Sequence, residues 1–289
     1  MSKKLDPKKI KALILDLDGT TLLPDTTLGE RTIQCLRKLI SSGMHVLFAT
    51  GRALEGAERF CTAVGMSGPM IFFNGAEVVD IPSGKVLGGS LLDMDIADFG
   101  LDLARSMGVH YQIYLPSGVA PDNETPARKW EMLIMEKQTP EADMYFNHTG
   151  IIPVIMDLKK VTANAGIPGC VKAMFLVEPS LHDEIRQKMY GKFGNRINII
   201  RSFPTFLEIL NAGVSKGKGL EIVMQHLGLT ANEVMVFGDE ENDLAMFSAA
   251  GFSAAPSSAR ENIREAADIV FGSNTEEGLA AYLEKTFLE

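Results

Sequence analysis

Short apolar runs alternate with amphipathic segments along most of the chain, a pattern typical of strands separated by helices. The first runs predict buried strands at residues 12–15, 45–50 and 70–73. Thr27 and Glu30 form a capping-box signal, so we expect a helix that begins there and ends near residue 42, before Gly43. A second helix is expected up to residue 65. Strands that alternate with helices at this spacing imply right-handed crossovers and a parallel sheet.

The middle of the chain has a different character. Ser83 and Gly84 are typical of a hairpin turn, and a proline-rich loop follows later. Helices are predicted at residues 95–107, 127–137 and 181–193. Strands are predicted at residues 109–115, 151–156, 171–177, 196–201 and 205–210. This mixture predicts an α+β domain inserted at residues 85–210, with a core of its own.

The first pattern resumes after the insertion. A helix that begins at Ser215 and ends near Gly228 precedes a buried strand at residues 233–237, and shorter helical and strand segments follow. The predicted fold class is therefore α/β, with a Rossmann-like parallel-sheet core interrupted by the α+β insertion. The core is expected to comprise residues 1–84 and 211–289.

Polar residues follow the first buried strand directly. Asp16 and Asp18 point to the same side of an extended chain, while Leu17 points away. Two adjacent carboxylates repel each other and are costly to desolvate, and a magnesium ion, which prefers oxygen ligands, would relieve both costs. Gly19 permits a sharp departure from the sheet, at the carboxyl edge where open α/β sheets bind ligands. For this segment alone, a plain strand end followed by an Asp-Gly turn is the alternative.

Polar residues also follow the other predicted strands, at the same edge of the sheet. Thr50, Asn74 and Asp239 each come directly after an apolar run. Asp239 would supply a third carboxylate to one metal ion, or it would simply favour the start of a helix. Asn242 and Asp243 would lie on one side of the first turn of that helix.

Phosphate-binding groups are predicted near these carboxylates. Thr50 and Gly51 offer a hydroxyl and backbone N–H groups where a helix begins, although an ordinary helix cap explains this pair equally simply. Lys216 is a candidate cation for phosphate oxygens, and a solvated surface lysine is the alternative.

Composition narrows the classes of function. The formal net charge of −9 and the pI near 5.2 argue against general binding to nucleic acid or to an anionic membrane. The three cysteines have no metal-ligand spacing and fit a reducing cytoplasm. We expect no signal peptide, because the apolar run after the basic start is short, and no run long enough to span a bilayer. A cytoplasmic protein, monomeric or homodimeric, is predicted.

Four motifs, in this order, resemble those of the haloacid dehalogenase superfamily of phosphotransferases. They are Asp16-Leu17-Asp18-Gly19-Thr20, Thr50-Gly51-Arg52, Lys216 in VSKGKGL, and Asp239, Asn242 and Asp243 in GDEENDLAMF. The insertion is similar to the type IIB cap of the Cof-like phosphatases, as are Asn74-Gly75-Ala76 and Leu207-Glu208-Ile209. The resemblance covers nearly the whole chain. Glu240-Glu241 depart from it, since small residues are common there, and they would disfavour polyanionic substrates.

The resemblance implies an Mg²⁺-dependent phosphomonoester hydrolase that acts on a small phosphorylated metabolite, with sugar phosphates as the default. Asp16 would be the nucleophile that forms an aspartyl-phosphate, and Asp18 the general acid and base. Asp16, the main-chain carbonyl of Asp18 and Asp239 would hold the metal, and Asp243 would support its waters. The transferring phosphoryl group would be bound by Thr50, Gly51, Lys216 and Asn242.

Alternatives stay open at this point. The acid at Asp18 favours a phosphatase or a phosphomutase over the transport ATPases of the superfamily, which carry threonine there. A sugar phosphomutase is the enzymatic alternative, because the eukaryotic phosphomannomutases resemble this chain in cap type. A phosphosugar-binding regulator without catalysis is the alternative from another class. The roles of Arg52 and Asn74 are open, as is the choice among cap residues for the substrate: His110, Tyr111, Arg128, Lys129, Trp130, Tyr145, His148 and Lys172.

Overall fold

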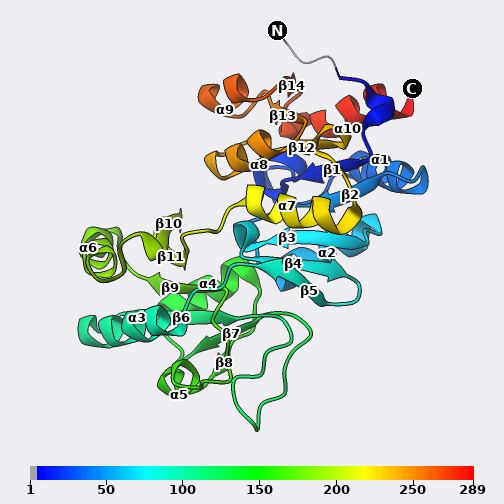
Figure 1. Cartoon of the computed structure of the whole chain (residues 1–289). Coiled ribbons are helices and arrows are strands. Elements are labelled where there is room, and N and C mark those ends of the chain that lie inside the picture. The colour runs from blue at the N-terminus through cyan, green and yellow to red at the C-terminus, as the bar shows by residue number, and fades with distance from the viewer. Residues whose placement is uncertain (1–4) are drawn as a thin grey trace. The chain divides into compact units, whose positions relative to one another are not determined.

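The computed structural model describes residues 5–289, which form two compact units (Figure 1). The first unit contains the chain up to Arg52 together with Ala57–Gly89 and Ser215–Glu289. The second contains Ala53–Gly56 and Ser90–Val214. The chain therefore leaves the first unit, builds the second and returns. That the inserted part selects the substrate stays a prediction.

A five-stranded parallel sheet organises the first unit. Its strand order is β14-β13-β12-β1-β2, and every neighbouring pair is parallel. The strands are β1 (Ala12–Leu15), β2 (His45–Phe48), β12 (Val234–Phe237), β13 (Phe252–Pro256) and β14 (Ile269–Phe271). The helices are α1 (Glu30–Ser41), most of α2 (Leu54–Val64, whose first three residues belong to the second unit), α7 (Lys216–Leu227), α8 (Leu244–Ala249), α9 (Glu261–Ala266) and α10 (Gly278–Leu283). All residues of the central strands β1 and β12 are buried, as their unbroken apolar sequences predict.

The third predicted strand has one parallel and one antiparallel neighbour. β3 (Gly68–Phe72) lies beside the end of β2 through one parallel bridge between Ala49 and Ile71. Its regular pairing is antiparallel, with β4 (Glu77–Ile81), which pairs in turn with β5 (Lys85–Gly89). The predicted hairpin turn at residues 83–84 joins β4 to β5, so it is confirmed, and Asn74 lies in the turn between β3 and β4.

The predicted capping box at the start of α1 is wrong. The helix begins at Glu30 with Gly29, which has no side chain to cap it, at the N-cap; the carboxylate of Glu277 accepts the N–H of Thr32 in the first turn at 2.9 Å instead. Thr27 instead donates its hydroxyl to Asp25 Oδ1 over 2.6 Å, and its backbone N–H binds the same oxygen at 3.0 Å. The Thr27 hydroxyl therefore belongs to a local Asx turn, and the carboxylate of Glu277 takes the first-turn N–H that a capping threonine would have accepted.

A six-stranded sheet organises the second unit, in the order β10-β11-β9-β6-β7-β8. All pairs are antiparallel except β7 with β8. The strands are β6 (His110–Leu115), β7 (Met132–Met135), β8 (Val154–Ile155), β9 (Lys172–Leu176), β10 (Ile197–Phe203) and β11 (Phe206–Asn211). The helices are α3 (Met94–Met107), α4 (Pro140–Thr149), α5 (Leu158–Thr162) and α6 (His182–Phe193).

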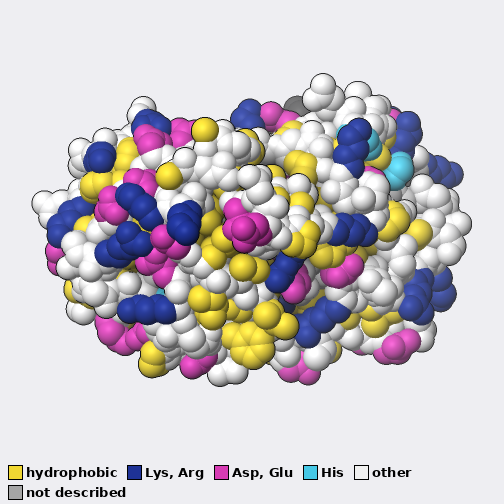
Figure 2. Space-filling model, turned by 90° about the horizontal axis from the view of Figure 1, so that it is seen from below, with side chains coloured by type: hydrophobic (Ala, Val, Ile, Leu, Met, Phe, Trp, Pro, Cys, Tyr) yellow, Lys and Arg dark blue, Asp and Glu magenta, His cyan; other side chains and the backbone are white. Residues whose placement is uncertain are grey.

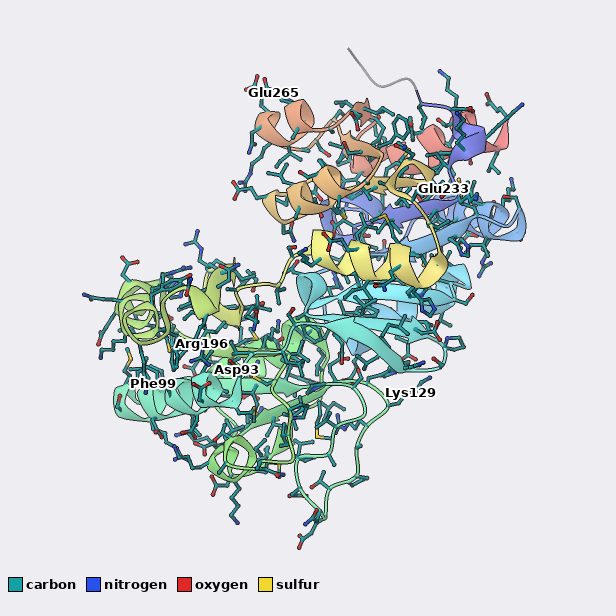
Figure 3. The ribbon with its side chains drawn as sticks, in the orientation of Figure 1. Asp93, Phe99, Lys129, Arg196, Glu233 and Glu265 are labelled. Carbon is teal, nitrogen blue, oxygen red and sulfur yellow. The ribbon has the colours of Figure 1, made fainter. Side chains whose placement is uncertain are left out.

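One hydrophobic core fills the second unit. Alternate residues of its strands, such as Ile113 and Phe175, pack with apolar residues of α3, α5 and α6. Phe99 meets Phe193 edge to face at 5.4 Å, and Arg196 binds Asp93 at 2.6 Å (Figure 3). The aromatic contact joins α3 to the last residue of α6. The ion pair joins Asp93, which precedes α3, to Arg196, which follows α6.

The helix predicted at residues 127–137 does not form. Residues Met132–Met135 are strand β7, which pairs with β6, and the helix comes later, at Pro140–Thr149 with Thr139 as its N-cap. Four consecutive apolar residues fit a helix or a strand, and pairing with β6 decides between them. Because both faces of this strand are buried, no alternation of polar residues marks it.

Charged side chains of both signs are interspersed on the face drawn in Figure 2, without a large area of one sign. Within residues 5–289, no helix combines the length and apolarity needed to cross a bilayer.

Short helices complete the structure: Pro7–Lys9, Leu17–Thr21, Phe73–Gly75, Pro179–Leu181, Gly194–Arg196, Ala231–Glu233, Glu241–Asp243, Asn274–Glu276 and Glu284–Leu288.

Candidate active site

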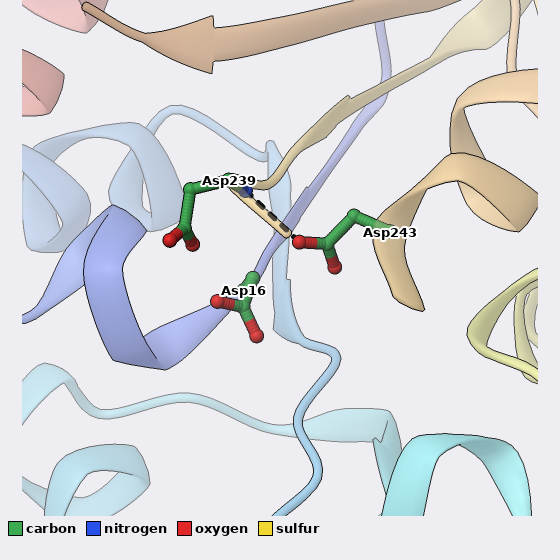
Figure 4. A group of neighbouring side chains, drawn as sticks. All are labelled: Asp16, Asp239 and Asp243. Carbon is green, nitrogen blue, oxygen red and sulfur yellow. Dashed lines mark hydrogen bonds between the residues drawn. The ribbon is translucent and has the colours of Figure 1, made fainter. Parts of the chain in front are cut away.

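Three carboxylates meet at the carboxyl edge of the parallel sheet (Figure 4). Asp16 follows β1 and Asp239 follows β12, and these strands are parallel neighbours with Leu15 paired to Phe237. Asp16 continues the ladder, since its N–H binds the Phe237 carbonyl at 3.0 Å. One oxygen from each of Asp16, Asp239 and Asp243 lies within 4.8 Å of the others. The predicted convergence of these residues is therefore present in the structure.

The chain after Asp16 wraps around the carboxylates. Gly19 has φ +80°, and a Cβ built on it would lie 2.1 Å from Asp239 Oδ2, so this position requires glycine on two grounds. Thr20 donates its hydroxyl to Asp239 Oδ1 at 2.8 Å, and Thr21 donates to the Asp16 carbonyl at 2.5 Å. The turn thus fixes both Asp239 and the backbone of Asp16.

Asp243 lies deeper in the protein than the other two carboxylates and supports them. It is fully buried, and its Oδ2 accepts the N–H of Asp239 at 2.9 Å and that of Glu240 at 3.1 Å. Figure 4 shows the first of these bonds. Its Oδ1 accepts from Lys216 Nζ at 2.7 Å. Asp243 therefore orients the loop after β12 and one cation.

Lys216 lies between two carboxylates. Its ammonium donates to Asp16 Oδ1 at 2.5 Å and to Asp243 Oδ1 at 2.7 Å, and the residue is 1% exposed. It is the first residue of α7, whose N-cap Ser215 accepts the N–H of Lys218. A solvated surface lysine, the alternative left open by the sequence, is thus excluded.

The pKa values of Asp16, Asp239 and Lys216 follow from the burial of these groups and their closeness to one another. Burial, together with the charges of Asp243 and Asp239, raises the pKa of Asp16, against the opposing effect of Lys216. Burial also raises the pKa of Asp239 to about 6, and the hydrogen bond from Thr20 only partly offsets it. For Lys216 burial works downward, but its two carboxylate partners outweigh it and raise the pKa. The ammonium stays charged and is bound by two of the three carboxylates, Asp16 and Asp243.

The predicted phosphate-binding residues occupy the adjoining strand ends. Thr50 is fully buried after β2, and its hydroxyl accepts the N–H of Arg52 at 3.1 Å. Asn242 Nδ2 donates to Asn74 Oδ1 at 2.9 Å. A Cβ on Gly51 would lie 3.1 Å from the same Asn74 oxygen. Asn74 also donates its backbone N–H to the Thr50 carbonyl at 3.0 Å, so it binds both Thr50 and Asn242. The sequence did not reveal these contacts, although Asn-Gly marks the turn that makes them possible.

Asp18 and Arg52 form an ion pair. Arg52 Nη2 lies 2.6 Å from Asp18 Oδ1, and Nε lies 2.8 Å from Oδ2. Arg52, whose role the sequence left open, therefore pairs with a carboxylate of the first unit. The hydrogen bonds to Asp18 raise the pKa of Arg52.

Four of the candidate residues of the insertion belong to the interior of the second unit. They are His110, Tyr111, Tyr145 and Lys172, all at most 6% exposed. Lys172 binds Glu208 at 3.0 Å, and Tyr111 donates to the Ala97 carbonyl at 2.9 Å. Arg128 and Trp130 are half-buried and Lys129 is exposed, while the side chain of His148 lies outside the described part. For these four buried residues, packing within the unit explains the side chains without a ligand.

The sequence pattern of the haloacid dehalogenase-like hydrolases matches residues 13–283. The chain belongs to this family. An HMP-PP phosphatase of Cronobacter sakazakii is 30% identical over 236 residues, which are 82% of this chain and 80% of that protein. The crystal structure of TM0651 from Thermotoga maritima has a TM-score of 0.82 at 28% identity and covers 96% of this chain and 97% of its own. The subclass IIB sugar phosphatase BT4131 has a TM-score of 0.70 at 21% identity and covers 95% of this chain and 98% of its own.

These likenesses confirm the predicted fold class, a haloacid dehalogenase fold with an inserted α+β cap of type IIB, and the resemblance to the Cof-like phosphatases. They also make the chain an enzyme that hydrolyses phosphoric monoesters. The alternative of a regulator without catalysis is set aside on the same findings.

Proposed function

We propose that this family member is an Mg²⁺-dependent phosphatase of small sugar phosphates that acts through an aspartyl-phosphate on Asp16. The observation that carries the proposal is the cluster in which Lys216 orients Asp16 beside Asp239 and Asp243. Such a cluster offers a nucleophile in a fixed orientation, a cation and unbalanced negative charge in one buried place.

The donor set fits a divalent metal ion. Three carboxylates lie together while the ammonium of Lys216 binds two of them, and burial, with the charges of Asp243 and Glu240 added, raises the pKa of Asp239 to about 6. Oxygen ligands of this kind suit Mg²⁺. Asp16, Asp239 and the main-chain carbonyl of Asp18 would hold the ion, and Asp243 would support its waters. When bound, the ion would screen the charge between the nucleophile and the substrate phosphate.

The reaction would proceed in two displacements. A carboxylate oxygen of Asp16 forms a bond to phosphorus while the bond from phosphorus to the leaving oxygen breaks, and Asp18 gives that oxygen its proton. Water then attacks the phosphorus of the aspartyl-phosphate, Asp18 takes the proton from the water, and inorganic phosphate leaves with the Asp16 carboxylate restored. Each displacement has a lower barrier than direct attack by water.

The groups around Asp16 would bind the transferring phosphoryl oxygens. Lys216 and Asn242 supply a charged and a neutral N–H donor, and Thr50 with Gly51 supplies a hydroxyl and backbone N–H groups. Fixed donors of this kind stabilise the charge that develops in the transition state. The contact of Asn74 with Asn242 would keep that amide in place.

A small phosphorylated metabolite is the expected substrate class, and its sugar part would be selected by the inserted unit. The protein has a net charge of −9, which repels anionic substrates. A substrate with one phosphate group is repelled less than one with several, so the net charge supports a substrate of this kind. Glu240 adds to this near the cluster, because its side chain is 47% exposed and its ion pair with the exposed Arg260, at 3.3 Å, only weakly offsets its charge. We propose a cytoplasmic enzyme, monomeric or homodimeric.

The test is release of inorganic phosphate by the purified protein, with Mg²⁺ and with a chelator. The panel contains hexose, pentose and triose phosphates, an aryl phosphate, and HMP-PP, which the name of the Cronobacter relative contains. Asp16→Asn should abolish release, whereas Asp25→Asn, which alters an exposed carboxylate bonded to Thr27, should keep it. Full activity of Asp16→Asn, or activity that ignores the chelator, would refute the proposal. Turnover only with a sugar bisphosphate present would indicate a mutase instead.

A further inference from the structure

Arg52 contacts Asp18 at two points. Nη2 donates to Oδ1 at 2.6 Å and Nε donates to Oδ2 at 2.8 Å, so each carboxylate oxygen has its own N–H. A two-point contact fixes both the position and the rotation of a carboxylate, which a single hydrogen bond cannot do. Both residues belong to the first unit.

Arg52 itself is held on three sides. Its backbone N–H binds Thr50 Oγ1 at 3.1 Å, and its carbonyl accepts the N–H of Phe73 at 3.1 Å. Its guanidinium lies 5.4 Å from the centre of the Phe60 ring, where a cation is attracted to the aromatic face. The side chain is 25% exposed, so it presents its N–H groups from a defined place.

Asp18 depends on this contact for its orientation. Its side chain is 52% exposed, at the start of the turn that continues through Gly19. Within residues 5–289, Arg52 is the residue whose side chain hydrogen-bonds this carboxylate. An exposed aspartate without such a partner would move among its staggered rotamers and lose a single orientation.

We propose that Arg52 is a positioning residue, which sets the orientation of the Asp18 carboxylate for proton transfer and acts on the reaction through Asp18 rather than through the phosphate. This inference rests on the function proposed above, in which Asp18 serves the leaving oxygen and the attacking water. The contribution of general acid–base catalysis depends on geometry first, because proton transfer needs hydrogen-bond reach.

The leaving group separates this role from a structural one. An alkyl alcohol needs a proton as it leaves, whereas an aryl alcohol leaves readily without one. Arg52→Ala should lower kcat for a sugar phosphate about ten- to a hundredfold, with KM nearly unchanged. The first-turnover burst of aryl alcohol from an aryl phosphate should keep its rate. Arg52→Lys, which retains the charge but offers no planar fork, should recover only part of kcat.

A double-mutant cycle tests the route of the effect. In the Asp18→Asn background, Arg52→Ala should change kcat less than twofold, because the partner it acts through is already lost. Arg59→Ala is the matched control, since Arg59 also lies over the Phe60 ring, at 4.5 Å, but is exposed and separate from the pair. That variant should keep wild-type kinetics, and melting curves should confirm that all variants are folded.

Three results would overturn the inference. An equal loss on both substrates with a raised KM, or a full-size loss in the Asp18→Asn background, would show that Arg52 binds the phosphate directly. An unchanged or increased kcat in Arg52→Ala would show that the pair does not assist catalysis. Wild-type protein that releases no phosphate from any ester would instead refute the proposed function, and the inference with it.

Discussion

The charged residues of this site cost folding stability because they are buried, and the same charges suit the site to the proposed metal ion and phosphate. Lys216 is buried at the first position of a helix, where a positive charge is disfavoured by the helix dipole, and its bonds to Asp16 and Asp243 compensate. Among residues 5–289, no cation is hydrogen-bonded to Asp239, and the hydroxyl of Thr20 donates to its Oδ1. The uncompensated charge therefore resides mainly on Asp239, on the side where we propose the metal.

Asp239→Asn should stabilise the protein in the absence of metal. The folded-state pKa of Asp239, about 6, lies above the ordinary value of 3.8, so the wild-type protein loses stability as the pH rises from about 4 to about 6 and bears the full cost at pH 7. The amide keeps an acceptor for Thr20. With a chelator at pH 7, we expect a gain of about 1–3 kcal/mol in the free energy of unfolding, measured by urea denaturation.

The gain should shrink below pH 6, where the wild-type carboxyl takes up a proton, and the variant should lose Mg²⁺ activation. Asp25→Asn is the exposed control and should show no gain. A variant that is less stable than wild type at pH 7 would show that burial of the Asp239 charge does not destabilise the folded protein.

At the scale of elements, one tight turn connects the strands to the site. Phe73, Asn74 and Gly75, between β3 and β4, all have positive φ, at +49°, +59° and +101°. Such conformations cost of order 1–3 kcal/mol for each residue other than glycine and persist where surrounding contacts enforce them. Here the turn brings Asn74 to Asn242 and places Gly75 against the start of α7. The strain is therefore located beside the groups that we propose to bind phosphate.

Gly75→Ala should disturb both stability and activity. A Cβ at this position would lie 2.1 Å from the Ser215 carbonyl oxygen, directly before Lys216, so α7 must shift. We expect a loss of about 3 kcal/mol or more in the free energy of unfolding and a clear fall in phosphate release. Gly43→Ala is the matched control: its φ is +91°, but no atom lies within 4 Å of the added Cβ. It should cost only about 1–2 kcal/mol and keep its activity. Equal effects of the two would mean that α7 tolerates the shift.

Local sequence patterns predict most of the helices and strands, but they do not predict which strands and side chains pair with one another. The parallel strands and their polar ends could be predicted, because an apolar run and the residue that ends it are adjacent in the chain. Strand β7 could not, since its four apolar residues become a strand only beside β6. The contacts of Arg52 with Asp18 and of Asn74 with Asn242 join positions 34 and 168 residues apart, so no local pattern marks them.

At the scale of the whole molecule, the two units can be observed separately. Trp130, the single tryptophan of the chain, belongs to the second unit, so its fluorescence reports on that unit. His110 is buried in the same unit, where Nε2 lies 3.1 Å from Gln112 Oε1 and Nδ1 lies 2.9 Å from Thr139 Oγ1. A neutral ring satisfies both partners, with the proton on Nε2 and a hydroxyl donated to Nδ1.

The second unit should therefore lose stability in mild acid. Burial lowers the pKa of His110 below its ordinary 6.5, so the unfolded chain takes up the proton first. Stability is full above pH 6.5 and falls below it, by at most about 1.4 kcal/mol per pH unit from this group. The urea midpoint of Trp130 fluorescence should fall between pH 7.5 and 5.5. His110→Asn should flatten this dependence, and His226→Asn, exposed in the first unit, should not. An unchanged slope in His110→Asn would assign the effect elsewhere.

Mass spectrometry of acid-quenched enzyme shows whether Asp16 carries the phosphoryl group. Asp18→Asn protein with Mg²⁺ and an aryl phosphate is the best sample, because the aryl alcohol leaves without a proton donor while hydrolysis of the intermediate lacks its base. We predict that the peptide containing Asp16 gains the mass of one phosphoryl group, and that the gain is absent in Asp16→Asn. Release of the aryl alcohol in a burst without any phosphorylated peptide, or a phosphoryl group on another residue, would contradict the account.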